Sequence, residues 1–470
     1  MAQPLRDNSD LDRSGGAPAL LCISQSFSPD TTPTAIRASK LLEKLSARWD
    51  VAVVTEARGE HGDGRIRVES VPSRRPRRLL AALRRLRLDK LLEIFVWPDE
   101  SIFWAPAAIF AGRRLIREHT PRAIVVFMMP YSAGLVGVAL SRLTGLPLVL
   151  NLDDSLTCTD MHPEFPTRLH YRMARALEDF YARQADAVVY VSATNLEEVG
   201  SRQREDVREK FHLVRYGADH AESHPERTPG ERFEIVYVGA MSGWWAVIEQ
   251  GRHSGRLRRI YGAWTRLGQY ERTVLDQRTS SPTIIGLAIL DALAEHPGWE
   301  GRVHLTLYGN PYSPVVVECA LQSAGIDSVV TVVGLLPHDE VADILARADL
   351  LFITLPARVD GSRGGRISAK TYEYLTTDRP ILAAVPPGEN WDYLAGKPGV
   401  WLVDPNDRRR MQGVIVELAQ DKFAGRARAF DRAELRDELS YDTRASEFEE
   451  VIHAAIKRRS RPGRPPQSLG

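Results

Sequence analysis

The sequence lacks a cysteine framework and the short motifs of several common enzyme classes. Its 470 residues contain only three cysteines, which lie far apart at Cys22, Cys158 and Cys319. Without a CxxC pair, neither a disulfide framework nor a zinc ribbon is predicted, and reduced thiols in the cytoplasm are expected. GxGxxG, GxxxxGK[ST], HExxH and GxSxG are also missing. NAD-dependent hydride transfer, P-loop ATP hydrolysis and two classes of hydrolase therefore lose their main support.

An excess of one charge and a long uninterrupted hydrophobic run are absent as well. Lys and Arg number 62 and Asp and Glu 61, a net charge of +1, which argues against a dedicated nucleic-acid-binding protein. The uncharged stretch 123–140 approaches the length of a membrane span, but Pro130 and Gly134 interrupt it. We predict a strand, a turn and a helix there. A cytoplasmic protein is expected, either soluble or lying on a membrane surface.

Short apolar and β-branched runs alternate with segments of helical spacing along most of the chain. This strand–helix series begins near residue 20 and begins again at residue 234, after the Pro/Gly/charge-rich stretch 223–231. Such alternation is typical of parallel sheets with crossover helices. The predicted fold class is therefore α/β, with two Rossmann-like, doubly wound domains that face an interdomain cleft.

The breaks in this series define the predicted domains. We expect a disordered N-terminal segment at 1–18, an N-terminal domain at 19–222, a second domain at 232–438 with an insertion at 244–280, a C-terminal helix at 439–459 and a disordered tail at 460–470. From Arg252 to Arg278 the insertion holds seven arginines against two acidic residues, together with several aromatics. Either it opens into the cleft to hold a phosphate and stack on a ligand, or it packs as an Arg-rich surface helix.

The segment with the clearest chemical meaning is 360–375, which follows a predicted strand at 350–354. It contains three glycines, Gly361, Gly364 and Gly365. Glycine allows the backbone to approach a ligand closely. A helix is predicted to begin near Ser368, and the amide groups at a helix start suit a phosphate or diphosphate.

Charged side chains accompany this glycine-rich loop. Arg366 and Lys370 add positive charge near the helix start, and Glu373 lies further along the helix. A carboxylate only accepts hydrogen bonds and therefore suits the hydroxyls of a ribose or sugar. A flexible surface loop, capped by Ser368 and with Glu373 in solvent, is an equally weighted alternative.

Two acidic residues, Asp153 and Asp154, follow the predicted strand at 148–152. Ligands of parallel sheets bind at the carboxyl ends of the strands, so this pair is a second candidate for a functional role. Capping of the next helix by Asp154 or Ser155 is the alternative.

The segment 65–90 is strongly basic, with ten Lys and Arg residues against two acidic ones. Leucines recur at nearly helical spacing within it, which predicts a basic amphipathic helix. Residues 74–91 could then contact an anionic membrane or bind an anionic acceptor. A solvated helix with its leucines in the core is the alternative.

The C-terminal part of the chain carries the most specific family resemblance. The stretch KTYEYLTTDRPIL at 370–382 resembles the "K-x-x-E-Y-L-A-x-G-x-P-V" signature of the GT-B-fold retaining glycosyltransferases of family 4, the "glycosyl transferases group 1" enzymes. Residues 332–341 (VVGLLPHDEV), 185–192 (ADAVVYVS) and the turn at 211–219 are similar to other motifs of that family. The resemblance extends over roughly residues 20–456.

The resemblance implies transfer of a sugar, with retention, from an NDP-sugar donor to a hydroxyl acceptor such as a glycan or a lipid-linked precursor. It implies no metal ion, and no cofactor beyond the donor substrate. Carried over by position, it implies catalytic roles for Asp154, Lys370 and Arg278, of which the last two would neutralise the diphosphate. The implied donor-binding residues are Gly364, Gly365, Arg366, Ser368, Lys370 and Glu373.

The sequence departs from the family pattern at three places. The usual glycine pair in the first loop is replaced by residues 31–34, TTPT. Many relatives carry two glutamates eight positions apart, whereas the first position here is Gly365. A basic pair that is expected soon after Gly239 is displaced by the insertion. Two alternatives therefore stay open: a sugar-nucleotide epimerase of the same fold, and a non-catalytic partner that binds a nucleotide sugar or polysaccharide.

Overall fold

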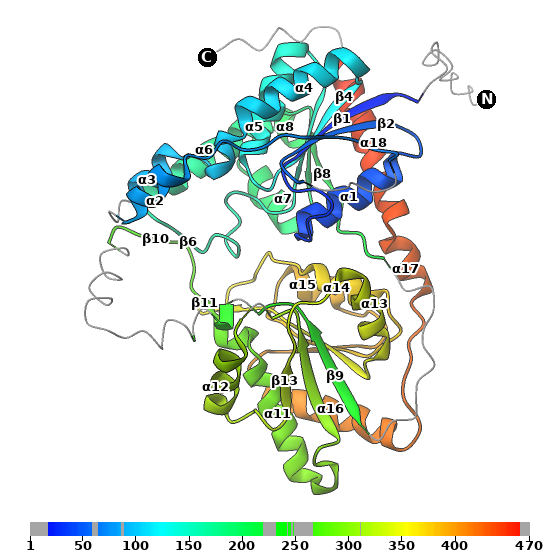
Figure 1. The fold of residues 1–470 in the computed structure, drawn as a ribbon. Coiled ribbons are helices and arrows are strands. Elements are labelled where there is room, and N and C mark those ends of the chain that lie inside the picture. The colour runs from blue at the N-terminus through cyan, green and yellow to red at the C-terminus, as the bar shows by residue number, and fades with distance from the viewer. Residues whose placement is uncertain are drawn as a thin grey trace, which may run out of the picture.

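The computed structural model describes residues 17–58, 64–85, 89–219, 232–241, 243–245, 248, 267–310 and 312–460. Within them the chain forms two lobes, each built around one parallel sheet, which lie one above the other in Figure 1. We call them the N lobe and the C lobe. This arrangement confirms the predicted fold class of two Rossmann-like domains. The predictions for residues 1–16 and 461–470 lie outside the described ranges.

The N lobe contains a seven-stranded parallel sheet in the order β3-β2-β1-β4-β5-β7-β8. Its strands are β1 (Ala19–Ser24), β2 (Asp50–Thr55), β3 (Arg67–Ser70), β4 (Ala123–Phe127), β5 (Leu148–Leu152), β7 (Ala187–Tyr190) and β8 (Phe211–Leu213). The helices are α1 (Pro33–Leu45), α2 (Arg77–Arg85), α3 (Asp89–Phe95), α4 (Ala105–His119), α5 (Ser132–Thr144), α6 (Arg168–Gln184), α7 (Ala193–Gly200) and α8 (Glu205–Arg208), with a 3-10 turn at Glu100–Phe103. Every residue of β1, β4 and β5 is buried, because helices cover both faces of a parallel sheet.

The C lobe contains a six-stranded parallel sheet in the order β13-β12-β9-β14-β16-β17. Its strands are β9 (Phe233–Val238), β12 (Val303–Tyr308), β13 (Val330–Val332), β14 (Leu350–Thr354), β16 (Ile381–Ala384) and β17 (Val400–Val403). The helices are α11 (Pro282–Glu295), α12 (Pro314–Ala324), α13 (His338–Arg347), α14 (Ala369–Leu375), α15 (Glu389–Leu394), α16 (Arg408–Phe423) and α17 (Ala433–Leu439), with 3-10 turns η3 (Gln277–Ser280) and η4 (Pro297–Trp299).

Each sheet has one point at which the strand order reverses. In the N lobe this point lies between β1 and β4, and in the C lobe it lies between β9 and β14. Ligands of open α/β sheets bind outside the carboxyl ends of the strands at such points. The fold therefore directs the search for a site to the loops that follow these strands.

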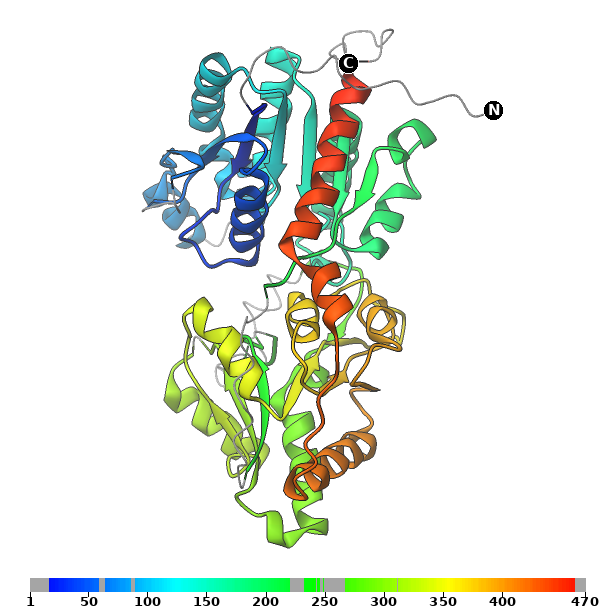
Figure 2. The same cartoon turned by 90° about the vertical axis from the view of Figure 1, so that its right-hand side faces the viewer.

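The last helix, α18 (Tyr441–Arg459), belongs to the core of the N lobe although it follows the C lobe in sequence. Figure 2 shows it running along the N lobe. Its Phe448 ring stacks on Phe127 of β4, with 6.1 Å between ring centroids. Glu449 accepts a hydrogen bond of 2.8 Å from Nε1 of Trp49. The chain thus returns from the C lobe to the N lobe before α18.

The leucine spacing predicted one helix in the basic segment, but residues 65–90 do not form a single helix. The segment begins with strand β3 at the edge of the sheet, and α2 follows only from Arg77. The charged residues of 67–70 alternate with Val68, which packs against the core, so strand pairing with β2 outweighs the helical pattern there. Among the described residues, no helix is both long enough and apolar enough to cross a bilayer.

The insertion ends as a strap that joins the two lobes. Strand β10 (Tyr270–Glu271) pairs with β6 (Glu164–Phe165) of the N lobe, and β11 (Leu275–Asp276) pairs with β15 (Ala357–Arg358) of the C lobe. The aromatic ring of Tyr270 packs against Tyr171, 5.0 Å between centroids. At its start, Trp244 and Trp245 are buried in the C-lobe core. These described aromatics serve packing, which matches the packing alternative; 246–247 and 249–266 lie outside the described residues.

Candidate active site

The N-lobe wall of the candidate site begins where β5 ends. Asp153 is buried there and accepts hydrogen bonds from Thr34 Oγ1 (2.7 Å) and Asn151 Nδ2 (3.2 Å). It also forms an ion pair of 3.4 Å with the fully buried Arg37, whose guanidinium donates to the carbonyls of Val214 and Arg215. Asp153 is therefore a structural residue that holds the end of β8 against α1.

Asp154 is the acid of this pair that remains available for chemistry. It is half-buried and accepts no hydrogen bond from the described residues. Burial, and next the negative charge of Asp153, raise its pKa to about 6, whereas the positive charge of Arg366 acts in the opposite direction. Since Arg366 belongs to the glycine-rich loop of the C lobe, a charge of the second lobe acts on this acid of the first.

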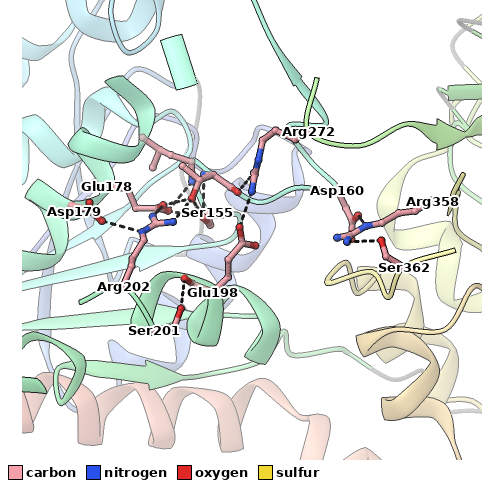
Figure 3. A network of polar contacts seen from close by, with 12 residues as sticks. Ser155, Asp160, Glu178, Asp179, Glu198, Ser201, Arg202, Arg272, Arg358 and Ser362 are labelled. Atoms are coloured by element: carbon pink, nitrogen blue, oxygen red, sulfur yellow. Dashed lines mark hydrogen bonds and ion pairs between the residues drawn. The ribbon is translucent and has the colours of Figure 1, made fainter. Parts of the chain in front are cut away.

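The loop after Asp154 is held rigidly by one buried carboxylate, Glu178 of α6. Its Oε1 accepts hydrogen bonds from Ser155 Oγ (2.6 Å) and Leu156 N (2.9 Å), and its Oε2 accepts one from Thr157 Oγ1. Arg202 forms an ion pair with the same carboxylate (Figure 3). Because the loop is tied at three successive residues, the backbone beside Asp154 has little freedom to move.

Tyr131 and His162 line the same region of the N lobe. The Tyr131 hydroxyl lies 3.1 Å from His162 Nε2, and burial followed by the charge of Asp154 raises the pKa of Tyr131. Burial, with a smaller contribution from Arg272, lowers the pKa of His162, so this imidazole is neutral at physiological pH. The sequence analysis did not select either residue, since a lone Tyr and a lone His carry no motif.

The C-lobe wall is centred on Lys370, in the first turn of α14. Its ammonium lies 5.2 Å from the ring centroid of Tyr237 and forms no ion pair with the described residues. It packs against Gly239, at the carboxyl end of β9, where a Cβ atom would overlap the lysine side chain. Lys370 thus places a positive charge at the point where the strand order of this sheet reverses.

Glu373, one helical turn after Lys370, faces a cavity of about 470 Å³ between the lobes. Lys40 of α1 and Asp219, which form an ion pair of 3.0 Å, lie on its wall, as does Tyr441 of α18. The remaining lining residues are Ile36, Gly217, Ala218, Val341, Ala342, Leu345, Ala346, Thr376 and Thr377. A largely apolar cavity with a few polar groups at its edge is the usual form of a small-molecule site.

The glycine-rich loop has a partner that the sequence did not reveal. The backbone N–H groups of Gly365 and Arg366 donate to Oδ2 of Asp160, at 2.6 and 3.1 Å, and Asp160 belongs to the N lobe. In this arrangement the two amides bind a carboxylate of the chain itself. Ser368, predicted to cap α14, occupies the N-cap position, but its side chain makes no capping hydrogen bond.

Arg278 lies on η3, away from the two walls just described. Its guanidinium forms an ion pair of 2.8 Å with Asp276, and its side chain is 85% exposed. The turn itself is held at the carboxyl end of β14, because Thr354 Oγ1 donates to the carbonyl of Thr279 at 2.7 Å. Of the predicted site residues, Arg366 acts on Asp154 through its charge, and Lys370 and Glu373 lie one turn apart on α14. The side chain of Arg278 instead faces solvent.

Residues 34–217 match the family described as "Glycosyl transferase 4-like domain". This range covers most of the N lobe and includes Asp154. No curated protein sequence matches the chain significantly.

Solved structures resemble the whole chain. Sucrose-phosphate synthase from Thermosynechococcus elongatus is 14% identical with a TM-score of 0.59, and the match covers 93% of this chain and 98% of that one. An α,α-trehalose-phosphate synthase (UDP-forming) from Burkholderia vietnamiensis is 13% identical with a TM-score of 0.57, covering 95% and 99%. Anabaena HepE in complex with UDP and glucose is 16% identical with a TM-score of 0.56, covering 93% and 99%. At these identities the likeness establishes the shared two-lobed fold.

Proposed function

We propose that the protein transfers a sugar, with retention, from an NDP-sugar to a hydroxyl acceptor, because the chain has the GT-B fold and residues 34–217 match the glycosyl transferase 4-like domain. The acceptor class is a glycan or a lipid-linked precursor. The observation that supports this most directly is the position of Lys370, an ammonium without an ion-pair partner in the described chain at the strand-order reversal of the second sheet. Glu373 follows one turn later in an interlobe cavity.

In this proposal, Lys370 neutralises the diphosphate that leaves as the glycosidic bond of the donor breaks. A fixed cation stabilises the developing negative charge without a metal ion. Glu373 accepts hydrogen bonds from hydroxyls of the nucleoside. Asp154, which is largely ionised above pH 6, stabilises the positive charge that develops at the anomeric carbon. Arg278 would join them only if its side chain left Asp276 and turned toward the donor.

Calorimetric titration with UDP tests this donor site. We chose UDP because it is bound in the HepE structure. Lys370→Ala and Glu373→Ala should each weaken binding at least tenfold, about 1.4 kcal/mol. The matched controls are Lys457→Ala on α18 and Glu295→Ala at the end of α11, both exposed. Unchanged affinity in both site variants, with a folded protein, would exclude the proposed site.

A non-catalytic binding partner is the second candidate, because Asp160 occupies two amides that the family resemblance assigns to the donor. Turnover separates the two. A catalytic protein consumes the donor only when an acceptor is present, whereas a binding partner leaves it intact. Consumption without any acceptor would instead favour the epimerase. A thermal-shift screen of NDP-sugars identifies the donor, since a bound ligand stabilises the folded state.

We also propose that the protein is cytoplasmic and contacts anionic membranes through residues 74–91. In the described part of this segment, Arg78 and Arg85 on α2 are exposed, whereas Leu80 is buried against Leu92 and Val96. The basic face of this helix is therefore free to meet lipid phosphates. The exposed Phe95 at the end of α3 adds an apolar side chain to the same part of the lobe.

A further inference from the structure

A carboxylate of the C lobe is bound at the start of a helix in the N lobe. Glu389, the first residue of α15, is 7% exposed. Its Oε1 accepts hydrogen bonds from the backbone N–H of Ala193 and from Arg215, both at 2.8 Å, and its Oε2 accepts one of 3.0 Å from Thr194 N. The Ser192 hydroxyl, which caps α7, also lies against Oε2. Both oxygens of the Glu389 carboxylate therefore accept hydrogen bonds from the N lobe.

A carboxylate of the N lobe is bound in the same way by the C lobe. Asp160 is 7% exposed, and its Oδ2 accepts from the amides of Gly365 and Arg366. Its Oδ1 accepts a hydrogen bond of 2.7 Å from Nε of Arg358, as the right side of Figure 3 shows. Hydrogen bonds between charged and oriented polar groups are among the stronger ones in proteins.

The two contacts meet at the glycine-rich loop. Gly364 N donates to Pro387 O at 3.1 Å, and Glu389 N donates to Gly364 O at 3.0 Å. A Cβ atom on Gly388 would overlap the backbone of Gly364, and one on Gly365 would overlap Thr194 of α7. The loop is therefore held between Asp160 on one side and the turn that carries Glu389 on the other.

Because each carboxylate belongs to one lobe and its donors to the other, both sets of hydrogen bonds exist only when the lobes are together. The same closure places Arg366 where its charge acts on Asp154. If the lobes separated, the Gly365 and Arg366 amides would lose their acceptor. The loop would then also lose the contacts that give it its present shape.

We propose that Asp160 and Glu389 are positioning residues that form a reciprocal interlobe latch, which couples closure of the lobes to the shape of the loop at Gly364–Ser368. The contacts that form the latch join only groups of this chain. Its relevance to catalysis rests on the proposed function, since that function assigns the loop to the donor.

Distances between two spin labels test the latch directly in the full chain without ligand. Cys319 is exposed on α12 of the C lobe, whereas Cys22 and Cys158 are buried, so one label site is already present. Arg117→Cys, at an exposed position of α4, supplies the second site in the N lobe. The protein with the intact latch should give one narrow distance distribution. Asp160→Asn and Glu389→Gln should each shift it to longer and broader distances.

Asp421→Asn is the matched control, because among the described residues this carboxylate pairs with Arg426 and Arg428 of the C lobe and with no group of the N lobe. Ser192→Ala removes one hydroxyl from the latch and keeps the variant series informative if a carboxylate variant does not fold. Unchanged distances in Asp160→Asn, Glu389→Gln and Ser192→Ala would overturn the latch. UDP titration of the protein with the intact latch reports separately on the proposed function. If the latch variants open but the protein with the intact latch does not bind UDP, that function is refuted and the latch stands.

Discussion

The side chain of Lys370 packs against Gly239 at the carboxyl end of β9, and it fits there because glycine has no side chain. A Cβ atom at position 239 would overlap Cε and Nζ of the lysine. Gly239 also has a φ of 137°, which a residue with a side chain rarely adopts. The expected basic pair after this glycine is displaced by the insertion, and the structure places a cation from α14 at the same loop.

Replacement of Gly239 by alanine should therefore act on ligand binding through Lys370. We expect Gly239→Ala to move the ammonium and to weaken UDP binding about tenfold, roughly 1.4 kcal/mol. Gly413→Ala in α16 is the control, because a Cβ atom there meets open space. That control should stabilise the helix by up to about 1 kcal/mol and leave UDP affinity unchanged. Calorimetry and thermal unfolding measure both effects, and equal affinity of the two variants would contradict the role of Gly239.

The raised pKa of Asp154 makes stability depend on pH. The folded-state pKa is about 6 and the ordinary value is 3.8, so the stabilising protonated form is present at low pH and is lost as the pH rises through 6. The free energy of unfolding of Asp154→Asn should equal that of the wild type at pH 4 and exceed it at pH 8 by roughly 1–3 kcal/mol. Urea unfolding across this range measures the difference. Asp206→Asn, an exposed site on α8, should show no such trend, and a flat Asp154→Asn series would argue against the buried, charged environment.

Glu178 should matter for stability far more than its neighbour Asp179, although both contact Arg202. Glu178 is 1% exposed and holds three successive residues of the loop after Asp154. Glu178→Gln breaks a buried pair and should cost about 3–5 kcal/mol in the free energy of unfolding. Asp179→Asn, at a more exposed site, should cost about 1 kcal/mol or less. Similar losses for the two variants in urea unfolding would show that the loop is not held mainly by Glu178.

Membrane contact through α2 predicts a specific effect of charge reversal. Arg78→Glu with Arg85→Glu should abolish sedimentation with phosphatidylserine vesicles at low salt, because each basic residue near such a surface contributes about 1 kcal/mol. Arg409→Glu with Arg410→Glu changes the net charge by the same amount at exposed positions of α16, and this variant should still bind the vesicles. Binding that survives the α2 reversal, or that is insensitive to salt, would place the contact elsewhere.

The sequence alone was sufficient for the elements that depend on local patterns. Strands β5 and β14 lie at the residues that the apolar runs predicted, and α14 begins one residue after Ser368. Parallel strands buried on both faces leave a continuous apolar run, and crossover helices leave helical spacing between them. The two-lobed fold follows from that alternation, and the family resemblance agrees with the fold of the solved structures.

Tertiary structure decided which polar residues meet. Asp160 lies in a loop and Glu389 begins α15, both outside any motif, and the backbone amides that bind them are more than 190 residues away in the chain. The carboxylates find these amides because two separately folded lobes bring their loops to one cleft, which no local pattern encodes. The sequence could likewise place Lys370 on a helix, but it could not show that Gly239, more than 100 residues earlier, leaves room for it.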